Sequence, residues 1–269
     1  MNKPRYINWL IKEEEVTFED ETPLHCYKLD CALDDDVFDE WALHIRRHYV
    51  SDEDLEESVS LLSMTPAEYL YKYVIPQKED GFGCTSRSND ITEILISDLF
   101  EFVLSYTVPR CKHDNRSGKT QSEHGTDIIG YKFKNSNKTP SEADRLLAIE
   151  VKAGLSSDDY TPIADAINDS HKYDEFRHAL TLDFYRKRLK RMNNLEQSKD
   201  VSRFQQKPDY PYETFYIGAG VISRDRIENK IIMGLTADSL QLRSDNEVFL
   251  VYGRTLMEIT HDIYRRCTR

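Results

Sequence analysis

The segment LLAIEVKAGL carries a glutamate and a lysine inside an apolar run that is typical of a buried strand. Side chains alternate across a strand, so Glu150 and Lys152 project from one face while Ile149 and Val151 project from the other. The charged pair is therefore directed at a common point. A second apolar run, GTDIIGYKF, contains Asp127 as its single acid, near its start, where an adjacent strand would bring it beside Glu150.

These residue types indicate metal-assisted chemistry on a phosphate. Two carboxylates in a partly desolvated cleft repel one another, and a cation between them removes the conflict. Carboxylates and water suit Mg²⁺, which commonly binds through one or two protein carboxylates plus a substrate phosphate. Lys152 would then stand beside a metal-bound water. There it would orient or deprotonate the water, or neutralise charge that builds on the phosphorane.

The Glu-x-Lys pattern alone is weak, because Glu228 and Lys230 repeat it in the charged stretch SRDRIENK, which we interpret as surface. The first copy gains weight from its apolar strand, from the lone acid on a neighbouring strand and from the apolar helix expected before them. The competing interpretation is a salt bridge at a sheet edge, since opposite charges on one strand face do pair for small gains.

The elements expected around these residues alternate between helix and strand. The stretch SNDITEILISDLFEFVLSY is apolar on most of its circumference, as in a helix packed centrally against a sheet. Strands are then expected at 106–111, at TDIIGYKF and at LLAIEVKA, followed by a helix that Thr161, Pro162 and Asp165 begin. A basic helical stretch, strands at TFYIGAGVI and FLVYG and the helix LMEITHDIYRRC complete the chain. This mixture predicts an α/β or α+β fold with a mixed sheet.

The N-terminal part has its own elements. PLHCYKLDC predicts a strand, and residues 34–50 predict a helix with acids at its start and basic residues near its end. Thr65, Pro66 and Glu68 form a capping box that begins another helix. The Gly-, Ser- and charge-rich segment Gln77–Asp90 predicts a boundary. The length allows one large domain or one domain with an appendage.

The charge is distributed unevenly along the chain. The net charge is −12, and residues 1–80, with 20 Asp and Glu against 8 Lys and Arg, carry all of the excess. Residues 81–269 hold 28 of each sign. The acidic part is either a solubilising face or an element that docks on a basic surface and competes with nucleic acid.

The densest positive run lies in the stretch HKYDEFRHALTLDFYRKRLKRM, and phosphate contacts require such a patch. Its members are Arg186, Lys187, Arg188, Lys190 and Arg191. The alternative is a solvated basic helix that meets the acidic N-terminal part. The two interpretations are compatible, because an acidic arm over this patch would hold the protein inactive until a partner moved it.

Composition indicates a globular protein with reduced thiols. The five cysteines are odd in number and scattered, without a CxxC or a Cys/His spacing that would build a zinc site. The first residues lack an apolar segment behind basic ones, and no apolar run approaches about 18 residues. We therefore expect a cytoplasmic protein without a membrane partner.

The order of a helix, then GTDIIG, then AIEVKA resembles the PD-(D/E)xK nuclease superfamily, with an αβββαβ core, the acid on the second core strand and the E-x-K on the third. Thr126 stands in place of the proline. Over a longer span, RSNDITEILISDLFEF, GTDIIGYKF and LLAIEVKAG are similar to the HamA family, nuclease subunits of the Hachiman anti-phage defence system. The resemblance implies Asp127, Glu150 and Lys152 as the catalytic set, DNA as the target and the superfamily 2 helicase-like HamB as partner.

Further site residues follow from the same resemblance. Some superfamily members add an acid from the preceding helix, and Glu93 is the candidate, with Asp98 next. The carbonyl of Val151 would be a further metal ligand beside Asp127 and Glu150. His171 and Lys172, and the loop residue His124, are candidates for contact with the DNA backbone.

The sequence thus predicts an α/β fold with a PD-(D/E)xK, restriction-endonuclease-like core. This core is a central mixed sheet flanked by helices in residues 81–269, with an acidic α+β extension in residues 1–80 that binds a partner or regulates. The expected activity is Mg²⁺- or Mn²⁺-dependent hydrolysis of DNA with little sequence specificity. The alternatives are a degenerate nuclease fold that binds and regulates a helicase-like partner, or a hydrolase of RNA or of a small phosphate ester.

Overall fold

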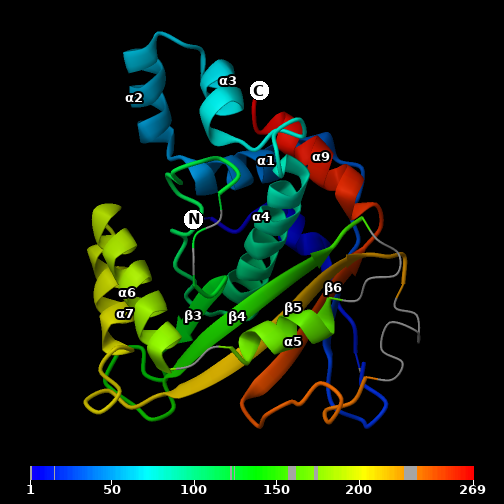
Figure 1. Cartoon of the computed structure of the whole chain (residues 1–269), viewed down its shortest axis with the longest axis vertical. Coiled ribbons are helices and arrows are strands. Elements are labelled where there is room, and N and C mark those ends of the chain that lie inside the picture. The colour runs from blue at the N-terminus through cyan, green and yellow to red at the C-terminus, as the bar shows by residue number, and fades with distance from the viewer. Residues whose placement is uncertain are drawn as a thin grey trace.

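The computed structural model describes residues 2–14, 16–121, 123, 125–156, 162–172, 175–226 and 235–269. They form a mixed α/β fold around a six-stranded sheet with the order β1-β2-β6-β5-β4-β3 (Figure 1). The strands are β1 (Leu10–Lys12), β2 (His25–Leu29), β3 (Ile128–Lys132), β4 (Arg145–Gly154), β5 (Glu213–Ser223) and β6 (Asn246–Gly253). The predicted mixed sheet is therefore confirmed.

The inner strands of this sheet are parallel and its edges are antiparallel. β4, β5, β6 and β2 run parallel, whereas β3 pairs with β4 and β1 with β2 in the opposite direction. Helices cover parallel strands on both faces, which explains why β5 and β6 are buried along most of their length. Gly218 in β5 lets a helix approach closely, because an added Cβ would lie 2.5 Å from Ile167 Cδ1.

Helices lie on both faces of the sheet (Figure 1). They are α1 (Asp35–Tyr49), α2 (Asp52–Leu62), α3 (Pro66–Tyr69), α4 (Gly83–Asp98), α5 (Ile163–Ser170), α6 (Glu175–Arg191), α7 (Leu195–Arg203) and α9 (Leu256–Arg266). A 3-10 turn, η1 (Arg5–Trp9), precedes β1, and the π-helical segments η2 (Leu70–Val74) and η3 (Leu99–Val103) extend α3 and α4.

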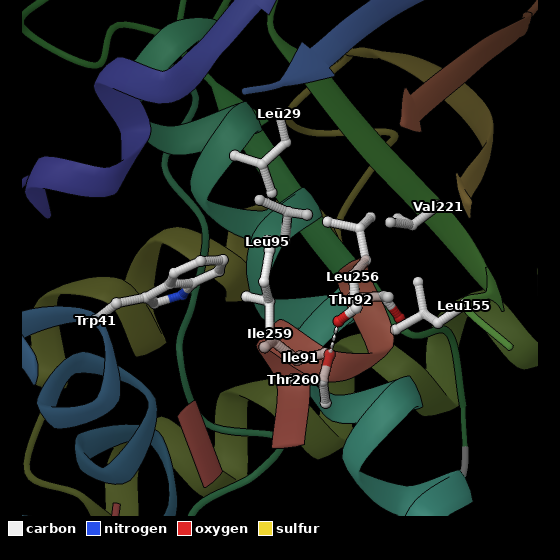
Figure 2. A pocket seen from close by; sticks show the side chains of 10 residues that line it. All are labelled: Leu29, Trp41, Ile91, Thr92, Leu95, Leu155, Val221, Leu256, Ile259 and Thr260. Carbon is white, nitrogen blue, oxygen red and sulfur yellow. Dashed lines mark hydrogen bonds between the residues drawn. The ribbon is translucent and has the colours of Figure 1, made fainter. Parts of the chain in front are cut away.

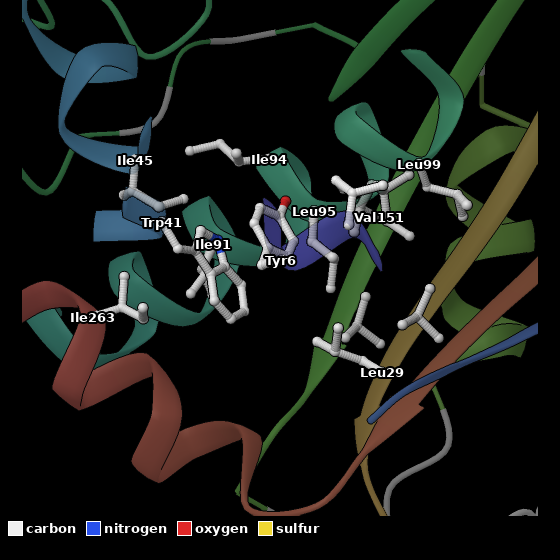
Figure 3. Close-up of a cluster of buried hydrophobic side chains, with 14 of the residues drawn as sticks. Tyr6, Leu29, Trp41, Ile45, Ile91, Ile94, Leu95, Leu99, Val151 and Ile263 are labelled. Carbon is white, nitrogen blue, oxygen red and sulfur yellow. The ribbon is translucent and has the colours of Figure 1, made fainter. Parts of the chain in front are cut away.

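The main core lies between the sheet and α4. Odd-numbered residues of β4, among them Ile149 and Val151, pack with side chains of η1, α1, α4 and α9, several of which are drawn in Figure 3. α5 packs on the opposite face, where Ile163 and Ile167 meet β6. α6 and α7 pack against β3 at the sheet edge. The even-numbered Glu150 and Lys152 thus project away from the α4 side.

Several helix signals in the sequence are confirmed. Asp34 caps α1, accepting a hydrogen bond from the Val37 backbone N–H at 3.2 Å, and acids begin the helix while basic residues end it. Thr65 and Glu68 form the capping box of α3, with proline at the first helical position. The cap expected from Thr161 lies outside the described residues, and α5 follows Pro162.

Three local predictions were wrong or incomplete. The strand expected at 106–111 is reduced to a single bridge between Thr107 and Tyr131, since Pro109 has no N–H to continue a ladder. Two strands, not three, therefore separate α4 from α5 among the described residues. α4 begins at Gly83, before the helix start expected at Ser88. The sequence reasoning also missed α2, η1 and β1.

The N-terminal residues share the sheet and the core with the rest of the chain. β2 pairs with β6, and Tyr6 and Trp41 pack in the same cluster as Ile149. The division at residue 80 remains a prediction. All five cysteines are free thiols, three of them buried. Among the described residues, no helix is both long and apolar enough to cross a membrane.

Candidate metal site and nucleic-acid surface

The structure brings Asp127, which directly precedes β3, beside Glu150 in the second half of β4. Ile128 pairs with Ile149 in the antiparallel register, so Asp127 and Glu150 are the next residues along the two strands. Asp127 is fixed in place, because its Oδ2 accepts a hydrogen bond of 2.9 Å from the Val151 N–H. We refer to Asp127, Glu150 and Lys152 as the acid–lysine site.

Glu150 is the electrostatically frustrated member of this site. Burial raises its pKa to about 8, and the nearby Asp127 carboxylate acts in the same direction. Lys112 and Lys152 oppose the shift without cancelling it. The local environment thus disfavours the charged form of Glu150, as expected where two carboxylates are close together.

Lys152 is held by an acid from the next helix. Its ammonium forms an ion pair with Asp169 of α5, and Lys172 contacts the other oxygen of Asp169 at 2.5 Å. Burial alone would lower the pKa of Lys152, but the Asp169 hydrogen bond and charge raise it. Lys152 therefore carries its proton at neutral pH, which favours roles in which it donates hydrogen bonds or balances charge.

The backbone of Val151 faces the same place as Asp127. The N–H and C=O of one strand residue point to the same edge, and the Val151 N–H points to Asp127. The Val151 carbonyl is consequently on the edge of β4 that faces β3, near the start of β3. This is the orientation that a backbone ligand to a shared cation requires.

Glu93 reaches the site through a lysine that the sequence reasoning missed. Lys112 Nζ lies 2.8 Å from Asp127 Oδ1 and 3.3 Å from Glu93 Oε2. The Lys112 side chain is only 4% exposed. His113, the next residue, lies 3.4 Å from Glu93 Oε2 and 3.5 Å from Asp90 Oδ1.

The residues predicted to contact DNA are spread over two surfaces. His171, which follows α5, is 2.9 Å from Asn246 Oδ1, while Lys172 adjoins Asp169. The basic run occupies the C-terminal half of α6, which packs at the β3 edge. His124 and the second E-x-K copy, 228–230, lie outside the described residues.

Part of the basic run is already paired. Asp183 binds both Arg186 and Lys187 within α6, at 2.5 and 2.6 Å. Arg188 donates to the backbone carbonyl of Asp114, which belongs to the same loop as Lys112. The remaining two members of the run, Lys190 and Arg191, have no ion pair with another described residue.

The acidic N-terminal part lies near this run without binding it. Glu53 and Asp54 at the start of α2 line a cavity of about 550 Å³ together with Arg188 and Arg191. Within the described part of the chain, no ion pair joins residues 1–80 to the basic run. The acidic cover over α6 remains a prediction.

The donor set fits a hard divalent cation. Asp127, Glu150 and the Val151 carbonyl offer only oxygen atoms, which Mg²⁺ and Mn²⁺ prefer. The raised pKa of Glu150 reflects a repulsion that a cation would remove.

A second pocket, which Figure 2 shows between α4, α9 and the sheet, is apolar and holds only about 10 Å³, so it suits no substrate.

Three contact residues escaped the sequence reasoning. Lys112 and Asp169 reach the site from a loop and from α5, and the Tyr185 hydroxyl of α6 donates to the Asp127 carbonyl at 3.2 Å. Lys112 sits in the stretch PRCKHDN, which has no periodicity or spacing that indicates a ligand. Asp169 lies 17 positions from Lys152 in the sequence. The available signal for a role of Asp169 was Lys172, three positions further along the chain.

The fold and this cluster define a mixed α/β protein in which two acids and a lysine of two neighbouring strands meet beside the start of β3. The chain belongs to the HamA family, whose model matches residues 4–267. This membership assigns it to the Hachiman anti-phage defence system. No curated protein matches the chain.

Proposed function

We propose that this chain is the metal-dependent DNase of its Hachiman complex. The observation that carries the proposal is the meeting of Asp127, Glu150 and Lys152 beside the end of β3, with Glu150 driven toward its neutral form by burial and by Asp127. A pure adaptor has no physical need for two adjacent acids in this position. The core formed by α4, β3, β4 and α5 would then be a PD-(D/E)xK core.

Each residue of the site has a distinct task in this proposal. Asp127, Glu150 and the Val151 carbonyl would hold Mg²⁺ or Mn²⁺, which when bound would supply positive charge to the scissile phosphate and acidify a water. Lys152, kept protonated by Asp169, orients the attacking water and balances charge on the phosphate oxygens. The backbone phosphodiester is cleaved by in-line attack of that water.

Binding of DNA would fall to the basic surface of α6. Lys187, Lys190 and Arg191 are exposed or partly exposed there, and phosphate contacts of this kind carry no base specificity. Sequence preference is therefore expected to be low. The partner in this proposal is the helicase-like HamB, which would deliver the DNA.

The first test is cleavage of plasmid DNA with Mg²⁺ or Mn²⁺, in the presence and absence of HamB. Glu150→Gln and Lys152→Met should each reduce cleavage about 100-fold or more, as expected when a charge that stabilises the transition state is removed. The matched control is the double variant Glu228→Gln/Lys230→Met, which alters the other E-x-K copy. It should cut like the wild type.

The same assay can contradict the proposed nuclease activity of this site. If both site variants cut as fast as the wild type, the acid–lysine site is not the nuclease centre. Linear DNA, single-stranded DNA and RNA in parallel reactions define the substrate class. A preference for RNA would mean that the same site belongs to an RNase and not to a DNase.

An adaptor without catalysis is the second candidate, and one observation favours it. Lys112 lies 2.8 Å from Asp127, and the charges of Lys112 and Lys152 both act on Glu150, so the site is partly neutralised by the protein itself. In that case the wild type binds HamB but no substrate is cut with any divalent metal. A wild-type complex that is folded, assembled and inert would favour the adaptor.

A further inference from the structure

Lys112 occupies the position of a cation between two acids. Its Nζ is 2.8 Å from Asp127 Oδ1 and 3.3 Å from Glu93 Oε2, and its charge also acts on Glu150. The side chain is almost fully buried, at 4% exposure. A buried ammonium is costly unless carboxylates surround it, and these carboxylates would repel one another without it.

The ammonium and a metal ion would compete for the same oxygen atom. Asp127 Oδ2 accepts the Val151 N–H, and Asp127 Oδ1 accepts the Lys112 ammonium. Both oxygens of this acid are thus engaged by the protein itself. A divalent cation that binds Asp127 must share an oxygen with one of these donors, and two cations on one oxygen repel each other.

We propose that Lys112 is an internal counter-cation that holds the acid–lysine site closed, and that it must leave Asp127 before a divalent cation binds. This inference rests on the proposed function and adds a control step to it. Lys112 then lowers the metal affinity of the isolated chain. Cleavage is held back until the ammonium is displaced.

The loop that carries Lys112 is connected to surfaces that could displace it. His113 contacts Glu93 and Asp90, and Arg116 pairs with Asp90 at 2.8 Å. Arg188 of the basic helix donates to the carbonyl of Asp114, two residues after Lys112. When Arg188 turns to a DNA phosphate, the loop loses this contact. DNA on α6 would thereby loosen the segment that holds the ammonium.

The test measures Mn²⁺ affinity of the purified full chain by electron paramagnetic resonance at a fixed pH. Lys112→Met should bind Mn²⁺ at least about tenfold more tightly than the wild type, which equals about 1.4 kcal/mol. Lys138→Met is the matched control, because Lys138 also bridges two acids, Asp200 at 2.7 Å and Glu196 at 2.9 Å. Its affinity should equal that of the wild type.

Adding Glu150→Gln separates the two proposals. Mn²⁺ binding that Glu150→Gln removes, but that Lys112→Met leaves unchanged or weakens, would overturn the role of Lys112 and leave the metal site standing. Absence of Mn²⁺ binding in both wild type and Lys112→Met would overturn this proposal together with the proposed metal-dependent activity.

A second readout covers a variant that folds poorly. The thermal midpoint of Lys112→Met and of the milder Lys112→Gln is measured with and without Mn²⁺. If the ammonium and the metal are interchangeable, Mn²⁺ should raise the midpoint more in these variants than in the wild type. Variants that stay unfolded with Mn²⁺ would contradict the proposal, since the ion would then fail to replace the lysine.

Discussion

Two clusters of ionisable side chains in this molecule differ in their burial and in how completely their charges are paired. The histidine cluster, formed by His44, His48 and Asp98, has ligand atoms within 4.8 Å of one another and is fully buried. The three residues of the acid–lysine site are each partly exposed. Ligand spacing alone would favour the histidine cluster as a metal site, but charge balance favours the other.

The histidine cluster already has its own partners. Arg110 is 2.7 Å from Asp98 Oδ1, and His44 Nε2 is 2.9 Å from Asp98 Oδ2, to which the Tyr6 hydroxyl also donates. Burial alone would raise the pKa of Asp98, but Arg110 and His44 lower it. An added divalent cation would be repelled by the guanidinium. This cluster is therefore a structural link between η1, α1 and α4.

Asp98→Asn should have the largest effect on stability. Arg110 would lose the charge that offsets its burial, although Glu101 still contacts it at 2.6 Å. Breaking a buried pair from one side costs about 3–5 kcal/mol. Urea unfolding should report a loss of this size. Asp183→Asn is the comparison, because its ion pairs with Arg186 and Lys187 lie on the partly exposed surface of α6. An equal loss there would show that burial is not what makes the loss of Asp98 costly.

In metal-free protein, Glu150→Gln should raise the free energy of unfolding, whereas Asp98→Asn should lower it. The pKa of Glu150 rises from 4.5 to about 8 on folding. Between these pH values the folded protein therefore keeps a proton on Glu150 that the unfolded chain releases. The free energy of unfolding of the wild type should therefore fall as pH rises from about 4.5 to about 8, relative to the Gln variant. We expect about 1–3 kcal/mol across this range, allowing for partial solvation.

The measurement is urea unfolding in EDTA at pH 5 and pH 8 for both proteins. A difference between wild type and variant that does not change with pH would show that Glu150 is not frustrated. Saturating Mn²⁺ should remove the pH-dependent difference, because the cation stabilises the carboxylate.

The sequence predicted the strands from β2 to β6 and the two acids, but neither β1 nor the counter-charges of the site. β4, β5 and β6 are readable because apolar runs bounded by turn residues persist along them, and Asp127 and Glu150 stand out as acids in such runs. Lys112 and Asp169 belong to a loop and a helix, where charged residues are normally solvated. Only the folded chain brings these side chains to the ends of the strands.

The same limit explains the errors in the elements. Gly83–Arg87 is rich in small and polar residues and was not expected to be helical, yet tertiary packing makes it the start of α4, in which Ser88 and Asp90 are buried. Asp90 is stable there because Arg116, in a distant loop, forms two hydrogen bonds to it at 2.8 and 2.9 Å. Local helix propensity does not include the effect of a partner that is distant in the sequence, so it could not predict this helix start.

Lys187→Gln should have the smallest effect on stability and a selective effect on DNA binding. The Lys187 side chain is 59% exposed and pairs with Asp183 within one helix, so its removal should change stability by less than about 0.5 kcal/mol. If α6 binds phosphates, DNA affinity should fall equally for all sequences, and the slope of log affinity against log salt should decrease by about 1. Lys12→Gln is the control, because β1 lies at the opposite edge of the sheet. Equal salt slopes for Lys187→Gln and wild type would contradict a DNA-binding surface on α6. The basic run would then be a solvated helix near the acidic α2.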